Sequence, residues 1–244
     1  MRRKDGMCKI AENDNNDQTA VIFDLDGVII DSLEVQRLAF ETVYRRFRKH
    51  DEPPFTEFMK HSGDSLHNIF SRMNLPLEMI ETYRAISSEN IYRIKLHNGI
   101  KELLPGLKNT NNYCGLCTGK ERKRTIDIMR KFDLLGFFDI IVCSDDIRFP
   151  KPDPESIYVI SGHLNVELEN MIIVGDAVND ILCARNAGIK SIAFTWGQAE
   201  EKALSEMSPD FIVNHPHELH MCIKNFLQNR NAREKRKNNS LRNK

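Results

Sequence analysis

Four groups of polar residues follow short apolar runs, three of them directly and the third group after a loop that begins with Asp145 and Asp146, and their side chains are of the types that bind and attack a phosphoryl group. The groups are Asp24-Leu25-Asp26-Gly27, Thr118-Gly119-Lys120, Lys151-Pro152-Asp153-Pro154 and Gly175-Asp176-Ala177-Val178-Asn179-Asp180. Clustered carboxylates repel one another unless a cation lies among them, and their hard oxygen ligands select a hard ion such as Mg²⁺. A lysine and a threonine can neutralise and hydrogen-bond phosphoryl oxygens, so the combination indicates phosphoryl transfer.

The apolar runs before these groups are predicted to be strands of one parallel sheet. They are short and rich in Val, Ile and Phe, which suits strands covered by helices on both faces. The predicted strands are residues 20–24, 113–118, 139–144, 171–176 and 191–196, with a weaker one at 211–213. Segments with helical spacing separate them, at residues 121–132, 154–164, 180–187 and 217–227. This alternation predicts an α/β fold with a doubly wound, Rossmann-like, mainly parallel sheet, whose ligands bind beyond the C-terminal ends of the strands.

One long interval interrupts the alternation of strands and helices. Residues 34–97 have apolar positions at helical spacing, and the prolines Pro53, Pro54 and Pro76 separate the helices. We therefore expect a helical cap domain at residues 34–97. The rest of the α/β core would consist of residues 20–33 and 98–228, and the polar residues 1–19 would form a flexible leader.

The composition is that of a globular protein, with 41% hydrophobic and 29% charged residues and a formal net charge of zero. No stretch approaches the roughly 20 apolar residues that cross a bilayer, and no apolar run follows the basic N-terminus as in a signal peptide. We expect no membrane partner and a cytoplasmic location. Residues 229–244 contain seven basic residues and one acidic residue. A disordered basic tail is the favoured interpretation, and nucleic-acid binding is the alternative.

The chain has six cysteines, two of which, Cys114 and Cys117, form a CxxC pair. A zinc site would need a second pair of ligands at suitable spacing, and none follows. The pair also lies along an apolar run rather than at the start of a helix. We therefore interpret these cysteines as buried structural residues, which agrees with a reducing cytoplasm.

Taken together, the motifs resemble those of the haloacid dehalogenase-like phosphohydrolases. The motifs are DLDGVIIDS at residues 24–32, Thr118, Lys151 in KPDP, and GDAVND at residues 175–180, in the order of the family. Over residues 20–215 the chain is similar to the phosphoglycolate phosphatase and β-phosphoglucomutase group, which has a helical cap inserted after the first motif. The resemblance implies a magnesium-dependent phosphatase that hydrolyses a small phosphomonoester, either a sugar phosphate or a phosphoglycolate-like compound, through an aspartyl-phosphate.

The resemblance also implies the catalytic roles within the first motif. Asp24 would attack phosphorus, which divides one hard displacement into two easier steps. Asp26 would protonate the leaving oxygen and then deprotonate the hydrolytic water. In an extended chain the two carboxylates would point to opposite faces, so the chain must turn directly after Asp24. Gly27 permits that turn.

The other motifs would bind the phosphoryl group and the metal. Phosphoryl oxygens are expected to contact Thr118, the amide of Gly119, and Lys151. Mg²⁺ is expected to bind Asp24, the carbonyl of Asp26, and Asp176, with Asp180 as a ligand or as support for the ligands. Two structural alternatives remain open: Thr118 as a helix N-cap and Asp180 as a first-turn acid. Asp145 and Asp146 would either approach the metal or begin a loop.

Substrate specificity is expected to come from the cap, which would act as a lid. The candidate residues are Lys60, His61, Ser62 and Gly63 in a polar loop, together with Arg72 and Lys120. Where the related mutases have a histidine on the first cap helix, this chain has Gln36, which disfavours a mutase. Dehalogenases lack Asp26, so its presence disfavours dehalogenation. Phosphonoacetaldehyde hydrolases use a cap lysine, and Lys60 keeps that alternative open.

Three hypotheses therefore remain. The first is a phosphatase whose partner is a small phosphorylated metabolite. The second is a β-phosphoglucomutase-like phosphotransferase. The third is a non-catalytic binding protein that uses the basic tail, which the complete motif set disfavours because a binder would not need Asp26 or Lys151. The oligomeric state is predicted only as a monomer or a weak dimer.

Overall fold

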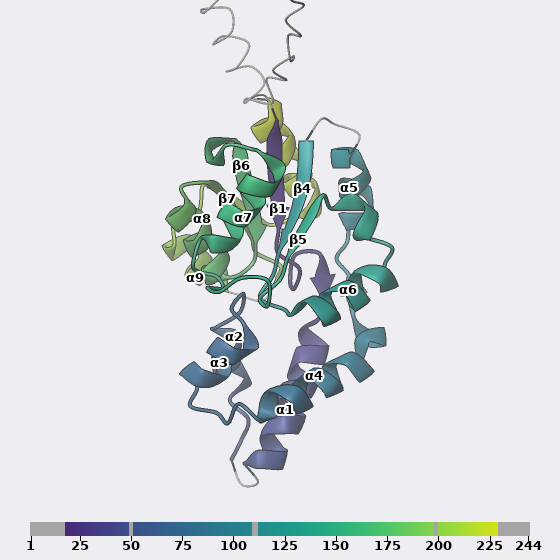
Figure 1. Cartoon of the computed structure of the whole chain (residues 1–244), viewed down its shortest axis with the longest axis vertical. Helices are drawn as coiled ribbons and strands as arrows, with labels where there is room; N and C mark the ends of the chain where they lie inside the picture. Colours follow the sequence, from purple (N-terminus) through teal and green to yellow (C-terminus); the bar gives the residue numbers. More distant parts are fainter. Residues whose placement is uncertain (1–17, 49–50, 109–111, 198–199, 229–244) are drawn as a thin grey trace, which may run out of the picture.

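The computed structural model describes residues 18–48, 51–108, 112–197 and 200–228. Its centre is a 6-stranded parallel sheet with the strand order β5-β4-β1-β6-β7-β8. The strands are β1 Thr19–Phe23, β4 Asn112–Cys117, β5 Ile140–Val142, β6 Met171–Gly175, β7 Lys190–Phe194 and β8 Phe211–Val213. The predicted fold class, a doubly wound parallel sheet with an inserted helical cap, is confirmed (Figure 1).

Successive residues of each strand point to opposite faces of the sheet, and helices cover the apolar side chains on both faces. In β1, Val21 and Phe23 belong to a core formed with α5 (Ile100–Lys108), α6 (Arg122–Lys131) and the helical residues 216–228. Their neighbours Ala20 and Ile22 belong to a second core, which α7 (Glu155–Leu164) and α8 (Val178–Ala187) complete. All residues of β1 are buried, which explains why the strand reads as a continuous apolar run.

The structure corrects several predicted boundaries. The first, second and fourth predicted strands end one residue earlier, so Asp24, Thr118 and Asp176 lie just beyond them. Thr19, assigned to the leader, is the first residue of β1 and is only 1% exposed. The strand β5 is shorter than predicted because it lies at an edge of the sheet, where one side lacks a partner strand. The predicted basic tail lies outside the described residues.

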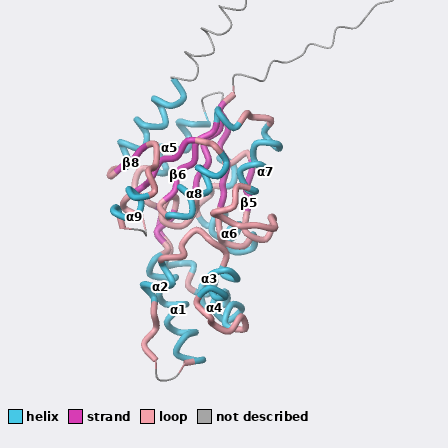
Figure 2. Tube along the Cα trace, turned by 90° about the vertical axis from the view of Figure 1, so that its left-hand side faces the viewer, coloured by secondary structure: helices cyan, strands magenta, loops and turns pink. Residues whose placement is uncertain are grey.

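The cap consists of four helices with a core of their own. These helices are α1 Leu33–Phe47, α2 Phe55–Met59, α3 Leu66–Arg72 and α4 Met79–Glu89. Aromatic rings fill their centre, with the rings of Phe40 and Phe58 4.6 Å apart and Phe70 and Tyr83 beside them. The cap lies beyond the C-terminal ends of the strands (Figure 1, Figure 2). It therefore covers the place where a doubly wound fold binds its ligands.

Two short strands connect the cap to the core. The strand β2 (Ile30–Asp31) pairs antiparallel with β3 (Lys95–Leu96), so the chain enters and leaves the cap at one point. The remaining elements are η2 Ile91–Arg93, η3 Leu135–Phe137, η4 Leu168–Asn170 and α9 Glu201–Glu206. Within the described part of the chain, no helix has both the length and the apolar character needed to cross a bilayer.

Candidate active site

The ends of three neighbouring strands place the first polar residues of the site. Asp24 follows β1, Thr118 follows β4, and Asp176 follows β6. The main chain of two of them continues the ladder, because Asp24 N donates to Val174 O at 2.9 Å and Thr118 N to Val142 O at 3.0 Å. All three side chains are buried. The sheet therefore fixes their backbones and points them toward the cap.

Lys151 binds two of the acids from the loop that follows β5. Its Nζ lies 2.7 Å from Asp24 Oδ1 and 2.5 Å from Asp180 Oδ1, and it donates to Cys117 O at 3.1 Å. Burial alone would lower the pKa of Lys151, but the charges of Asp180 and Asp24 hold it well above its usual value. The lysine is therefore a protonated cation at the centre of the site.

Three buried carboxylates provide a donor set that fits a divalent cation. Single oxygen atoms of Asp24, Asp176 and Asp180 lie within 4.8 Å of one another. Burial, together with the charges of Asp180 and Asp26, raises the pKa of Asp24 to about 7 even though Lys151 lowers it. Such crowded acids favour a bound cation, and oxygen donors of this type suit Mg²⁺. The residues present thus fit the metal that the sequence predicts.

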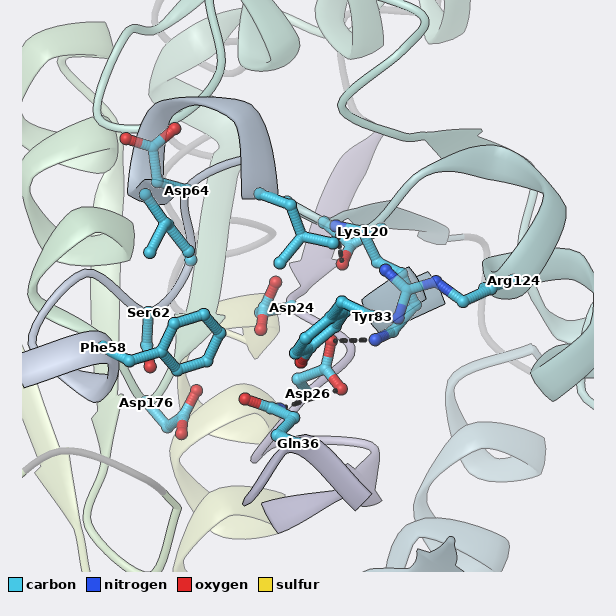
Figure 3. Close-up of a pocket in the computed structure, with 15 residues that line it drawn as sticks. Asp24, Asp26, Gln36, Phe58, Ser62, Asp64, Tyr83, Lys120, Arg124 and Asp176 are labelled. Atoms are coloured by element: carbon cyan, nitrogen blue, oxygen red, sulfur yellow. Dashed lines mark hydrogen bonds and ion pairs between the residues drawn. The ribbon is translucent and has the colours of Figure 1, made fainter. Parts of the chain in front are cut away.

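A turn after β1 brings Asp26 to the same space. Gly27 has a φ of +80°, and a Cβ atom there would lie 1.9 Å from Asp176 Oδ2, so only glycine allows this turn. Ser32 and Gln36 donate to Asp26 Oδ1. Lys120 Nζ lies 3.1 Å from Asp26 Oδ2 (Figure 3). Both oxygens of this carboxylate are therefore held in place.

The acids open into a small cavity under the cap. Its volume is about 50 Å³, whereas one water molecule needs roughly 10–15 Å³. Its lining is Asp24, Asp26, Gln36, Phe58, Ser62, Gly63, Asp64, Leu66, Ile69, Tyr83, Thr118, Gly119, Lys120, Arg124 and Asp176. The rings of Phe58 and Tyr83 face the acids (Figure 3). The cavity has room for a group of a few heavy atoms between the cap and the ends of the strands.

The structure places only part of the predicted specificity set in the cavity lining. Ser62, Gly63 and Lys120 line the cavity. Lys60 does not, because its side chain is 65% exposed and pairs with Glu57 at 2.7 Å. His61 also lies outside the lining, and Arg72 instead pairs with Asp64 Oδ2 at 3.0 Å. In this loop Ser62 and Gly63 face the cavity while the preceding Lys60 and His61 do not, a division that a polar loop sequence does not reveal.

The geometry also decides the structural alternatives. Thr118 does not cap α6, since the N-cap is Glu121 and Thr118 Oγ1 accepts from Lys120 N at 3.2 Å. Asp180 is a first-turn acid of α8, because its Oδ2 accepts from Ala177 N at 3.0 Å, and its Oδ1 also binds Lys151.

Asp145 and Asp146 belong to the loop after β5 rather than to the cavity. Asp145 accepts from Arg122 N at 2.8 Å, and Asp146 forms an ion pair with the Arg122 side chain. Neither residue lines the cavity. Of the two alternatives, the start of a loop therefore holds for both.

Sequence reasoning missed a buried charged group at the boundary between the cap and the core. Arg124 Nε and Nη2 bind the two carboxylate oxygens of Glu121, and Arg124 Nη1 donates to Ser87 Oγ of the cap at 3.0 Å. Its guanidinium lies 5.6 Å from the centre of the Tyr83 ring. Helical spacing offered one signal, since Glu121 and Arg124 are three residues apart. Their contact with α4 had no signal in the sequence.

The buried ion pair of Glu121 and Arg124 is expected to stabilise the folded chain. Burial would raise the pKa of Glu121, but Arg124 and Lys120 lower it to about 2, well below the ordinary value of 4.5 for a glutamate. Glu121→Gln should therefore lower the free energy of unfolding at pH 7 by about 3 kcal/mol. The wild-type advantage should fall to about half near pH 3 and vanish below pH 2, because Glu121 then becomes protonated in the folded state as well.

Urea unfolding at pH 7 and at pH 3 measures this difference. Glu206→Gln on the exposed face of α9 is the matched control, and its unfolding free energy should stay at the wild-type value at both pH values. A constant difference between wild type and Glu121→Gln across this range would contradict the assigned ion pair.

Comparison with known proteins agrees with this fold and site. The family model described as haloacid dehalogenase-like hydrolase matches residues 21–194. The pyrophosphatase PpaX of Bacillus velezensis is 32% identical over 204 residues, which cover 80% of this chain and 91% of that protein. A haloacid dehalogenase-like family hydrolase from Streptococcus pneumoniae is 27% identical with a TM-score of 0.73, covering 85% of this chain and 99% of the other. A predicted phosphatase from Clostridium acetobutylicum is 26% identical with a TM-score of 0.76, covering 85% and 98%.

Fold and site together define a hydrolase with a doubly wound α/β core and an inserted helical cap. More narrowly, the chain belongs to the haloacid dehalogenase-like hydrolase family, because the family model spans most of the core and the whole cap. The resemblance inferred from the motifs is thereby confirmed. The chain is an enzyme of this family.

Proposed function

We propose that the protein is a magnesium-dependent phosphatase that hydrolyses a small phosphomonoester through an aspartyl-phosphate on Asp24. The observation that carries this proposal is the contact of Lys151 with both Asp24 and Asp180 beside the cavity under the cap. A protonated lysine next to a carboxylate nucleophile reduces the electrostatic repulsion between that carboxylate and an approaching phosphate dianion.

The side chains suggest two chemical steps. In the first, a carboxylate oxygen of Asp24 bonds to phosphorus, the ester P–O bond breaks, and Asp26 gives its proton to the leaving oxygen. In the second, Asp26 takes a proton from water, the water oxygen bonds to phosphorus, and Asp24 is released. Thr118 and the Gly119 amide would hold the equatorial oxygens. Gly119 directly follows Thr118 at the edge of the cavity.

Asp24, Asp176 and the Asp26 carbonyl would hold Mg²⁺, and Asp180 would support them or join them. The metal would supply charge stabilisation for the phosphoryl oxygens. Asp180 is already bound by Lys151 and by the Ala177 amide. These two contacts favour the supporting role, in which Asp180 fixes the lysine and the start of α8.

The substrate is proposed to be small and anionic, with a sugar phosphate or a phosphoglycolate-like compound as the first candidates. The relatives named pyrophosphatase PpaX add pyrophosphate to the set. A screen of some dozens of phosphate compounds, ranked by kcat/KM with Mg²⁺ present, tests the proposal. Release of inorganic phosphate from at least one of them is expected. No release from any of them would exclude the phosphatase.

The mutase alternative is disfavoured by Gln36. Its Nε2 lies 2.8 Å from Ser32 Oγ and 3.4 Å from Asp26 Oδ1. An amide at this position can orient Asp26 but does not carry a proton as an imidazole does. Incubation with a hexose 1-phosphate separates the two activities, because isomerisation would favour the mutase and phosphate release the phosphatase.

The remaining features fit a metabolic enzyme. The described cysteines are free, and burial raises the pKa of Cys114 to about 12. Buried thiols of this kind agree with the proposed cytoplasmic location.

A binding protein that uses residues 229–244 on nucleic acid is the rival of a different class. A steeply salt-dependent affinity for DNA or RNA, lost on deleting those residues, would support it.

A further inference from the structure

The cap loop, residues 60–65, contacts the core through its main chain. Asn179, the second residue of α8, donates its side-chain amide to Ser62 O at 2.8 Å and to His61 O at 3.5 Å. Asn179 is 8% exposed and does not line the catalytic cavity. Because both acceptors are backbone atoms, this contact does not depend on which side chains the loop carries.

A second contact holds the same loop from the end of β4. The carbonyl oxygens of Gly63 and Asp64 face Gly119, where a Cβ atom would lie 2.6 Å and 2.4 Å from them. No residue other than glycine fits at that distance. A Cβ atom on Gly63 would in turn lie 3.3 Å from the Cβ of Asn179. The loop is therefore seated between the residues after β4 and those after β6.

Bonds inside the cap give the loop a defined shape. Asp64 Oδ1 accepts from Ser65 N at 2.7 Å and from Asn68 Nδ2 at 2.8 Å. Asp64 Oδ2 pairs with Arg72 at the end of α3, and the Asp64 side chain is fully buried. Since these partners all belong to the cap, the loop should move together with α3 when the cap opens.

We infer that Asn179 is a positioning residue that recognises the closed cap, a role that rests on the function proposed above. Its amide can bind the carbonyl oxygens of the loop only when the loop lies over the cavity. Asn179 also directly precedes Asp180, which binds Lys151. The helical turn that supports the acids therefore also holds the lid. Recognition through the main chain does not use the side chain of Ser62, a residue that lines the cavity.

Kinetics of Asn179→Ala and Asn179→Asp test this role. Asn179→Asp keeps the shape of the side chain and removes both N–H donors. With the best compound from the screen, both variants should raise KM roughly 10-fold and change kcat much less, because one or two neutral hydrogen bonds are lost. Asn90→Ala is the matched control, since Asn90 Nδ2 donates to Ile86 O at 2.8 Å entirely within the cap. Its KM should equal that of wild type.

Hydrogen exchange of residues 61–65 provides a measurement that does not require turnover. Each protein is compared with Mg²⁺ alone and with Mg²⁺ plus inorganic phosphate. Exchange in this loop should be faster in both Asn179 variants than in wild type and in Asn90→Ala.

Unchanged KM and unchanged exchange in Asn179→Ala would overturn the inference. Effects in Asn179→Asp alone would overturn it as well, since they would trace to the added charge beside Asp180. A wild-type protein that releases no phosphate would remove the proposed function. The exchange data would still decide whether Asn179 holds the loop.

Discussion

Replacing Asp24 with asparagine is expected to abolish phosphate release, with kcat at least about 10⁴-fold lower. The amide keeps the shape of the side chain but cannot form the aspartyl-phosphate. The fold should persist, because burial and nearby acids raise the pKa of Asp24 to about 7 and the folded chain therefore gains little from its charge. Lys151 also retains Asp180 as an anionic partner.

Steady-state assays of phosphate release, together with thermal unfolding of the same samples, measure this effect. Asp127→Asn is the matched control, because Asp127 lies on α6 with a side chain that is 46% exposed and outside the cavity. The control should keep wild-type activity and stability. Near-normal phosphate release by Asp24→Asn would remove the nucleophile assignment and with it the two-step mechanism.

Removal of Mg²⁺ by a chelator should lower the rate roughly 10³-fold, and an excess of Mg²⁺ should restore it. A metal contributes several kcal/mol of charge stabilisation in phosphoryl transfer, and each 1.36 kcal/mol changes the rate about tenfold. The structural reason is the set of three buried acids within 4.8 Å, of which Lys151 contacts two. Without a divalent cation these acids would repel the phosphate of the substrate.

Asp176→Asn separates a bound metal from a general salt effect. The variant loses one anionic oxygen of the set and should need at least about 10-fold more Mg²⁺ for half-maximal rate. Asp145→Asn, which removes an acid outside the cavity, should titrate like wild type. Activity that survives exhaustive chelation in the wild-type protein would contradict the magnesium site.

The fold class was predictable because the strands of the core are short apolar runs in the sequence. Residues 20–23 and 171–174 are apolar throughout, and helices bury both faces of the two strands. Their exact ends were not predictable. Asp24 and Asp176 are polar yet buried, so polarity does not mark the last strand residue. The edge strand β5 was also overestimated, because a lack of neighbours is a property of the assembled sheet.

The specificity residues show where sequence reasoning fails. Lys60 and Ser62 are two residues apart in one polar loop, but only Ser62 faces the cavity. Arg124 was not predicted at all, although its side chain is 6% exposed and lines that cavity. Its environment includes Tyr83 and Ser87, which come from a different domain. The orientation of the cap therefore decides which side chains line the cavity.

The sequence by itself determined that Asp24, Thr118, Lys151 and Asp176 follow strands, because each apolar run and the polar residues after it lie close together in the sequence. Only the tertiary structure decided that Lys151 bridges Asp24 and Asp180, that the cap covers a cavity of about 50 Å³, and that Asn179 donates to the cap loop. Those features depend on contacts between residues far apart in the chain. Such contacts are set by how the cap helices and the sheet pack together, and no local pattern encodes that packing.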